Sequence, residues 1–167
     1  NITLGARYDH NSQFGSSFVP RLAFTKVWGA YHVKVLASRA FRAPAIENFE
    51  LNPSVKPEKT TALEIEGGVQ VGKLFFAVNA FDLSIKQPII YLYDPLTNHE
   101  TYFNYPRTGT RGAEADLQYR AEWGWLRSTL TVSRAQDNRV PDYAVPGQDR
   151  HMVGVPNVKA TFAAHLK

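Results

Sequence analysis

The sequence predicts an all-β protein, built as an antiparallel up-and-down meander of about eight strands. Two observations lead to this fold class. Apolar and polar residues alternate with a period of two through most of the chain, most clearly over 113–121, which gives each strand one apolar and one polar face. Short turns and long polar connections also alternate along the chain, and that asymmetry is typical of a transmembrane barrel.

Length and composition are compatible with this class. The 167 residues could supply about eight membrane-crossing strands of ~9–11 residues each. No run approaches the ~20 apolar residues of a transmembrane helix. The chain contains no cysteine, and its formal net charge of +4 comes from interspersed charges of both signs. These features exclude a helical membrane protein and a disulfide framework, and they argue against a nucleic-acid-binding surface.

The alternation places each strand in turn. Strands are expected at 2–9, around Leu22 and Phe24, and at 31–38, 60–71, 74–86, 113–121, 126–133 and 158–166. Short turns are expected at Gly29, Gly72 and Gly124, and longer connections at 10–17, 39–59, 87–103 and 136–152. The last three connections should emerge at one end of the sheet and the three turns at the other. Trp28, Trp123 and Trp125 lie beside the turns, where an interfacial aromatic ring would sit.

The same period predicts which side chains share a face. The residues expected to face lipid are Ile65, Leu83, Leu117, Tyr119, Leu130 and Phe162. Those expected to face the lumen are Gln118, Thr131 and the charged residues Arg7, Arg21, Lys34, Glu64, Glu66, Asp82, Lys86, Glu114, Asp116, Arg120 and Arg127. The alternation is less regular over 74–79, which could hold a bulge that switches faces.

Several motifs then follow one another in a characteristic order. They are an aromatic-Arg-x-Pro segment, an Asn-Pro-x-x-Lys-Pro-Glu loop, a Glu-x-Gly strand, a Tyr-x-Asn and a Gly-x-Glu. Together these motifs resemble the barrel of TonB-dependent outer-membrane receptors. Val55 lies in the loop where Leu is commoner. The motif positions are Phe41, Arg42, Pro44, Asn52, Pro53, Lys56, Pro57, Glu58, Glu64, Gly67, Asn104, Gly112 and Glu114.

This resemblance implies a barrel of about 22 strands, filled by a plug domain and opened by energy from an inner-membrane TonB complex. It implies the outer membrane of a Gram-negative-type bacterium. The implied partners are outer-membrane lipid, the plug, the remaining barrel strands, the TonB complex acting through the plug, and a scarce nutrient such as a siderophore–iron complex, haem, cobalamin or a glycan. Residues 1–167 are expected to be a later part of such a barrel, without a plug and with open sheet edges near Ile2 and Phe162.

Aromatic and arginine side chains in the long connections are the candidate ligand contacts, because they bury a large area and keep polar handles. They are Tyr91, Tyr93, Tyr102, Tyr105, Arg107, Tyr143 and Arg150. Tyrosines near strand ends would suit an interfacial girdle equally well.

No catalytic residue, metal site or cofactor is expected. The segment 67–73 has the glycine and lysine spacing of a phosphate-binding loop, but Leu74 replaces the Ser or Thr that holds Mg²⁺. Two other functions stay open: a passive outer-membrane channel or adhesin-type barrel, and a soluble lipocalin-like binding module with its apolar faces inward.

Overall fold

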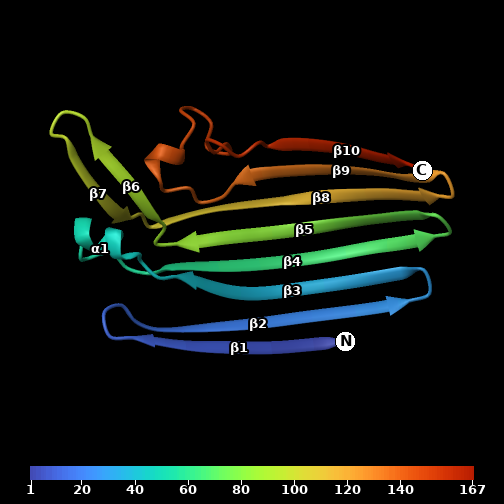
Figure 1. The fold of residues 1–167 in the computed structure, drawn as a ribbon, viewed down its shortest axis with the longest axis horizontal. Coiled ribbons are helices and arrows are strands. Elements are labelled where there is room, and N and C mark those ends of the chain that lie inside the picture. The colour runs from blue at the N-terminus through green and yellow to red at the C-terminus, as the bar shows by residue number, and fades with distance from the viewer.

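Eight strands of the computed structural model, which describes residues 1–167, form one open antiparallel sheet whose spatial order equals the chain order (Figure 1). These strands are β1 (Ile2–Asn11), β2 (Gly15–Trp28), β3 (Tyr31–Arg42), β4 (Glu58–Val71), β5 (Leu74–Lys86), β8 (Arg107–Ala121), β9 (Gly124–Ala135) and β10 (Val158–Leu166). A separate hairpin consists of β6 (Ile89–Asp94) and β7 (His99–Asn104), and the helices are α1 (Ile46–Leu51) and the 3₁₀ turn Pro141–Tyr143. Neither helix has the length and hydropathy needed to cross a membrane.

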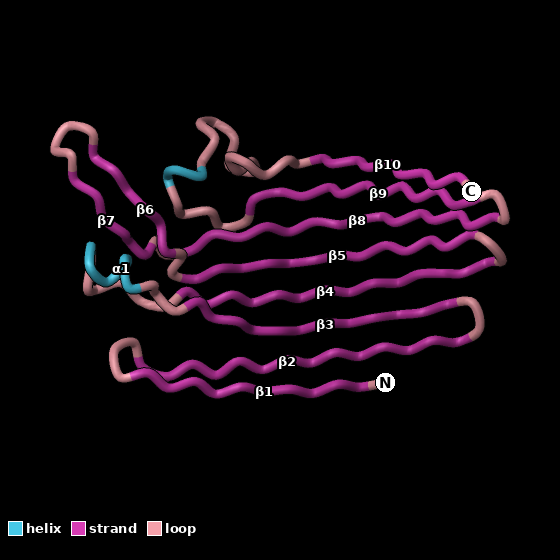
Figure 2. Tube along the Cα trace, in the orientation of Figure 1, coloured by secondary structure: helices cyan, strands magenta, loops and turns pink.

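The two ends of the sheet differ as predicted. Figure 2 shows three short turns at one end and, at the other, both helical segments and the β6–β7 hairpin. The turns after β2 and β4 place Gly29 and Gly72 at φ +55° and +54°, a left-handed backbone that glycine adopts without strain. We call these two ends the turn end and the loop end.

Several predicted strand ends were wrong. The 10–17 connection is a turn of only 12–14 between β1 and β2, the 87–103 connection contains the β6–β7 hairpin, and β8 begins at Arg107 rather than near 113. The physical reason is that strands running past the apolar band carry polar residues on both faces. The period of two therefore fades while the ladder of backbone hydrogen bonds continues.

The strand register shows which side chains lie on the same face of the sheet, because residues opposite each other on neighbouring strands point to the same side. Ile65, Leu117, Tyr119, Leu130 and Phe162 fall on one side, which we call the apolar face, and Glu66, Asp116, Gln118 and Thr131 on the other, the polar face. The predicted grouping is confirmed for these residues. The large exposed hydrophobic side chains of the strands gather mainly on the apolar face, among them Leu4, Leu63, Phe76, Val132 and Leu166.

The prediction was wrong for β5. Its pairing with β4 and β8 is continuous, so there is no bulge, and Leu83 shares the polar face while Asp82 and Lys86 share the apolar face. Asp82 lies opposite Leu63 and Arg111 in a row near the loop end, and Arg111 Nη2 approaches Asp82 Oδ2 to 2.5 Å. Asp82 tolerates this face because the row marks the edge of the apolar band and supplies a partner charge.

The predicted tryptophan ring needs one correction. Trp28 is paired with Tyr31 on the apolar face, and Trp123 packs beside Tyr119 with ring centres 6.3 Å apart. Trp125 instead lies on the polar face, opposite Arg120, where its ring stacks on His165. Two of the three tryptophans therefore suit an interfacial position at the turn end.

Burial is concentrated at the loop end. Of the 12 buried residues, all but Ala77 and Gly124 belong to the loop-end segments, among them Val55, Ile89, Ile90 and Val140. β1 and β10 are not paired with each other and form the two open edges, as expected. The sheet itself has no packed core, and it is held together by backbone hydrogen bonds and cross-strand side-chain pairs.

Candidate ligand-binding end of the sheet

Asn104 fixes the base of the β6–β7 hairpin. Its Oδ1 accepts a hydrogen bond from the Lys56 backbone N–H at 2.6 Å, and its Nδ2 donates to the carbonyls of Lys56 at 2.9 Å and Gln87 at 2.8 Å. One amide side chain thus joins the segment before β4 to both ends of the hairpin. The Tyr-x-Asn and Lys-Pro-Glu motifs, 48 residues apart, meet at this point.

Glu58 makes a second attachment. Its Oε1 accepts hydrogen bonds from the Ile89 backbone N–H and from Arg42 Nη2, both at 2.6 Å. Arg42 also donates to the Ile89 carbonyl at 3.3 Å. The motif residues Arg42 and Glu58, which are opposite each other on β3 and β4, therefore hold the first residue of β6. Pro44 and Pro57, which are close to them in sequence, are both buried.

Helix α1 supports the outer part of the hairpin. Asn52, which follows the helix, donates from Nδ2 to the Tyr102 carbonyl at 2.7 Å, and the Tyr102 hydroxyl donates to Glu47 Oε1 at 3.0 Å. The bond to Glu47 raises the pKa of the Tyr102 phenol. Glu47 was not predicted as a site residue, because its partner is 55 positions away and no local pattern joins them.

Three of the predicted tyrosines gather on one face of the hairpin. Tyr91 and Tyr102 are opposite each other with ring centres 5.4 Å apart, and Tyr93 lies two residues further along β6. Tyr91 and Tyr93 are each about half exposed, at 46% and 50%. Partial desolvation and a hydrogen bond to Glu100 raise the pKa of Tyr91. The hairpin therefore presents an aromatic surface with acidic neighbours.

The other predicted ligand residues lie elsewhere. Arg107 is held against the sheet by Ser84 Oγ at 2.9 Å and by Asp137 at 3.1 Å. Tyr105 follows β7 and donates its backbone N–H to the Pro88 carbonyl at 3.1 Å. Tyr143 and Arg150 belong to the connection before β10, and no contact joins their side chains to the hairpin tyrosines. The structure thus brings together Tyr91, Tyr93 and Tyr102 and leaves the remaining four apart.

Some charges on the polar face are paired across strands, whereas Arg21, Glu64 and Arg120 take part in no ion pair. Glu66 Oε1 accepts from Lys34 Nζ at 2.7 Å and lies 2.8 Å from His32 Nε2. Asp116 pairs with Arg127 at 2.8 Å, and Glu114 accepts from the Thr131 hydroxyl at 2.7 Å. The polar face therefore carries charges of both signs, and only some of them are neutralised by a neighbouring strand.

Two motif glycines differ in their surroundings. A side chain at Gly112 would overlap the Val132 carbonyl oxygen and the ring of Phe81, which packs over the glycine on the polar face. At Gly67 nothing lies within 4 Å of the position that a side chain would take. Close packing therefore explains the glycine of the Gly-x-Glu motif, whereas the surroundings of Gly67 do not require a glycine.

The comparisons with known proteins agree with this architecture. The family described as TonB dependent receptor-like, beta-barrel matches residues 1–166. No curated protein sequence matches the chain significantly.

Solved structures with a similar fold include two siderophore receptors and a copper transporter. The siderophore receptor PirA from Pseudomonas aeruginosa is 19% identical, with a TM-score of 0.72 over 81% of this chain and 31% of its own. PirA from Acinetobacter baumannii is 17% identical, with a TM-score of 0.72 over 96% of this chain and 28% of its own. The copper transporter OprC is 17% identical, with a TM-score of 0.63 over 91% of this chain and 25% of its own.

The chain thus spans about a third or less of the length of these structures. These similar structures are of receptors and a transporter rather than enzymes. Together with the two-faced sheet and its asymmetric ends, the match over nearly every residue leads to one conclusion: the chain belongs to the TonB-dependent receptor-like β-barrel family.

Proposed function

We propose that the chain is a wall segment of an outer-membrane receptor that takes up a scarce nutrient, most specifically a siderophore–iron complex, using energy passed from a TonB complex. The observation that carries this proposal is the attached β6–β7 hairpin, which holds three tyrosines at the loop end of a family barrel sheet. Aromatic side chains on a supported element suit a flat, partly apolar chelate, because little side-chain freedom is lost on binding.

In this proposal the apolar face contacts the lipid of the outer membrane and the polar face lines the lumen. The loop end faces the outside, where barrels of this kind carry their longer connections. The plug and the remaining strands belong to the rest of the barrel. Two of the similar solved structures are siderophore receptors, which supports the substrate class, whereas OprC, a copper transporter, shows that the fold serves other cargo.

The test uses the full-length receptor in Gram-negative cells lacking their own siderophore receptors. Tyr91→Ser combined with Tyr93→Ser should weaken binding of a ferric siderophore at least tenfold, because exposed aromatic anchors carry much of such binding energy. Tyr31→Ser, at the turn end of the apolar face, is the matched control and should bind normally. Uptake of radioactive iron should stop when a protonophore removes the energy supply. Uptake that continues without energy would favour the passive channel. Unchanged siderophore binding by the double variant would show that the β6–β7 hairpin is not part of the binding site.

A further inference from the structure

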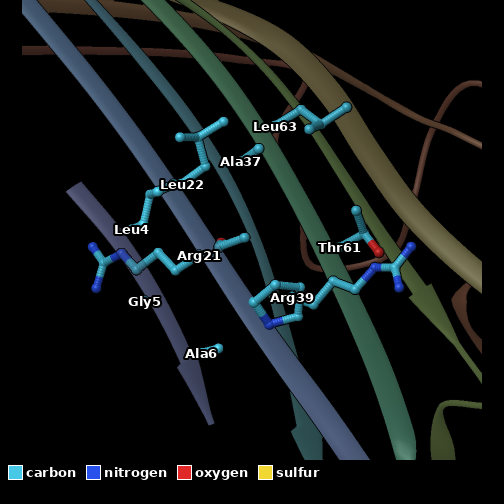
Figure 3. Close-up of a pocket in the computed structure, with 11 residues that line it drawn as sticks. Leu4, Gly5, Ala6, Arg21, Leu22, Ala37, Arg39, Thr61 and Leu63 are labelled. Atoms are coloured by element: carbon cyan, nitrogen blue, oxygen red, sulfur yellow. The ribbon is translucent and has the colours of Figure 1, made fainter. Parts of the chain in front are cut away.

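The apolar face is hollowed near the loop end, across β1 to β4. A hollow of about 790 Å³ is lined by one row of apolar residues, Leu4, Leu22, Ala37 and Leu63, which lie opposite one another on four successive strands. Figure 3 shows this row, with Ala6, Arg39 and Thr61 further along the strands. The small side chains of Ala6, Pro20 and Ala37 leave the space that larger residues would fill.

A second hollow, of about 330 Å³, adjoins the first toward the loop end and shares Arg39 and Thr61 with it. It opens because β2 and β3 are paired only as far as Arg21 and Ser38 and then part. Lys59 and Lys86 also line it, together with Phe18, Phe41 and hydroxyl-bearing residues, and no acidic residue is among the lining. We call the two hollows together the outer groove.

The cations of the outer groove have no acidic partner. Arg39, Lys59 and Lys86 are exposed and take part in no ion pair, whereas their neighbours Arg107 and Arg111 on the same face are paired with Asp137 and Asp82. By register, these three cations fall on the apolar face: Lys59 lies opposite Lys86, and Arg39 lies opposite Thr61 two residues from Leu63. A fourth cation of the lining, Arg21, lies opposite Gly5 and Ser38 on the polar face. Like charges placed opposite each other on a sheet are destabilising unless an anion lies between them.

We propose that the outer groove binds one phosphorylated membrane lipid, with the phosphate of its head group between Arg39, Lys59 and Lys86 and an acyl chain along Leu4, Leu22 and Ala37. The order of the groove matches the order of a lipid: cations and hydroxyls toward the loop end, then apolar side chains toward the middle of the sheet. Basic residues at the level of the head groups attract anionic lipid, and long basic side chains extend to that level from an apolar surface. The inference rests on the proposed placement of the apolar face in lipid.

The test is lipid binding by the full-length protein, stripped of lipid in detergent and followed by native mass spectrometry. The probe is dioleoyl phosphatidic acid, compared with zwitterionic dioleoyl phosphatidylcholine and with inorganic phosphate as a competitor. Lys59→Gln combined with Lys86→Gln should weaken phosphatidic acid binding about 25-fold, since each basic residue near an anionic head group is worth roughly fivefold. Lys26→Gln, which removes an exposed cation from the turn end of the same face, is the matched control and should leave binding unchanged.

The apolar half is tested separately. Ala37→Trp should fill the hollow and abolish tight binding, whereas Ala113→Trp, on the same face of β8, should not. Equal affinity for phosphatidic acid and phosphatidylcholine, or an equal loss in Lys26→Gln, would overturn the inference while leaving the membrane placement intact. Displacement of the lipid by millimolar inorganic phosphate would show an anion site without an acyl-chain site and would also overturn it. Failure to bind either lipid would contradict the membrane placement itself.

Discussion

Replacing Asn104 by aspartate changes the chemistry of one amide at the point where the β6–β7 hairpin joins the sheet. The introduced carboxylate keeps the acceptor for the Lys56 N–H but loses both donors. Its second oxygen would face the carbonyl oxygens of Lys56 and Gln87, which Asn104 Nδ2 approaches to 2.9 and 2.8 Å. Each lost hydrogen bond costs about 1 kcal/mol, and the facing oxygens add repulsion, so local opening of the hairpin should become easier by about 2–4 kcal/mol.

Hydrogen exchange of the amides of 89–103, measured by mass spectrometry on the full-length protein, reports this opening. The expected change is roughly 30-fold to several hundred-fold faster exchange at pH 7 in Asn104→Asp, with the sheet strands unaffected. Asn98→Asp is the matched control. Asn98 uses only its oxygen, which accepts from the Tyr93 hydroxyl at 3.0 Å, and its φ of +54° suits aspartate, so exchange should change little.

The pH dependence gives an independent check. Facing two carbonyl oxygens, the introduced carboxyl should have a folded-state pKa above the ordinary value of about 3.9. Its destabilisation is then complete above the folded pKa and disappears as the pH falls through it, because the protonated group can donate. Asn104→Ala should show no such recovery. Equal exchange at pH 7 in the wild type and Asn104→Asp would refute the attachment role of Asn104.

Three further predictions concern the sheet. Leu117→Arg, near the middle of the apolar face, should lower the free energy of unfolding in lipid vesicles by ~2–4 kcal/mol, whereas Gln118→Arg on the polar face should lower it by less than about 1 kcal/mol. Equal losses of the two variants in denaturant titrations would contradict the strand register. Gly112→Ala should lower the free energy of unfolding by about 1–3 kcal/mol in the same titration, because the added methyl group overlaps the backbone of the neighbouring strand. An unchanged free energy would mean that β8 and β9 can move apart at this point without loss of stability. An epitope inserted at Asn98 should bind antibody on intact cells and one at Lys73 should not, and the reverse pattern would invert the proposed orientation.

How far the fold could be predicted depends on how regularly apolar side chains occupy one face of each strand. Strand segments inside the band keep one continuous apolar face, so 113–121 could be recognised as a strand, whereas Arg107–Gly112 of the same strand could not. β6 was missed because Ile89 and Ile90 are both buried, which breaks the period of two. In β5, Leu83 and Asp82 were assigned to the wrong faces, since apolar residues occur on both faces of this strand and only the register with β4 and β8 decides between them.

For the candidate site, the residue types could be predicted from the sequence, but the contacts that hold them together could not. The tyrosines of 91–102 could be named as ligand candidates from their residue type alone. Their supporting partners could not, because Asn104 bonds to Lys56 and Tyr102 to Glu47 across separations of 48 and 55 residues. The motif residues Arg42, Glu58 and Asn104 could be named from the family resemblance, and the structure gives them an attachment role that their spacing does not reveal.

Because of the way it is attached, the β6–β7 hairpin can be exchanged as a unit. A two-stranded hairpin is at best marginally stable alone, so β6 and β7 depend on the anchors at their base. At that base the chain enters and leaves at adjacent points, where the Gln87 N–H donates to the Pro106 carbonyl and the Tyr105 N–H to the Pro88 carbonyl. Residues between these points can change in length and composition without disturbing the register of β5 with β8. A different hairpin grafted between Pro88 and Tyr105, with Asn104 retained, would therefore present a different binding surface while the eight-stranded sheet stays unchanged.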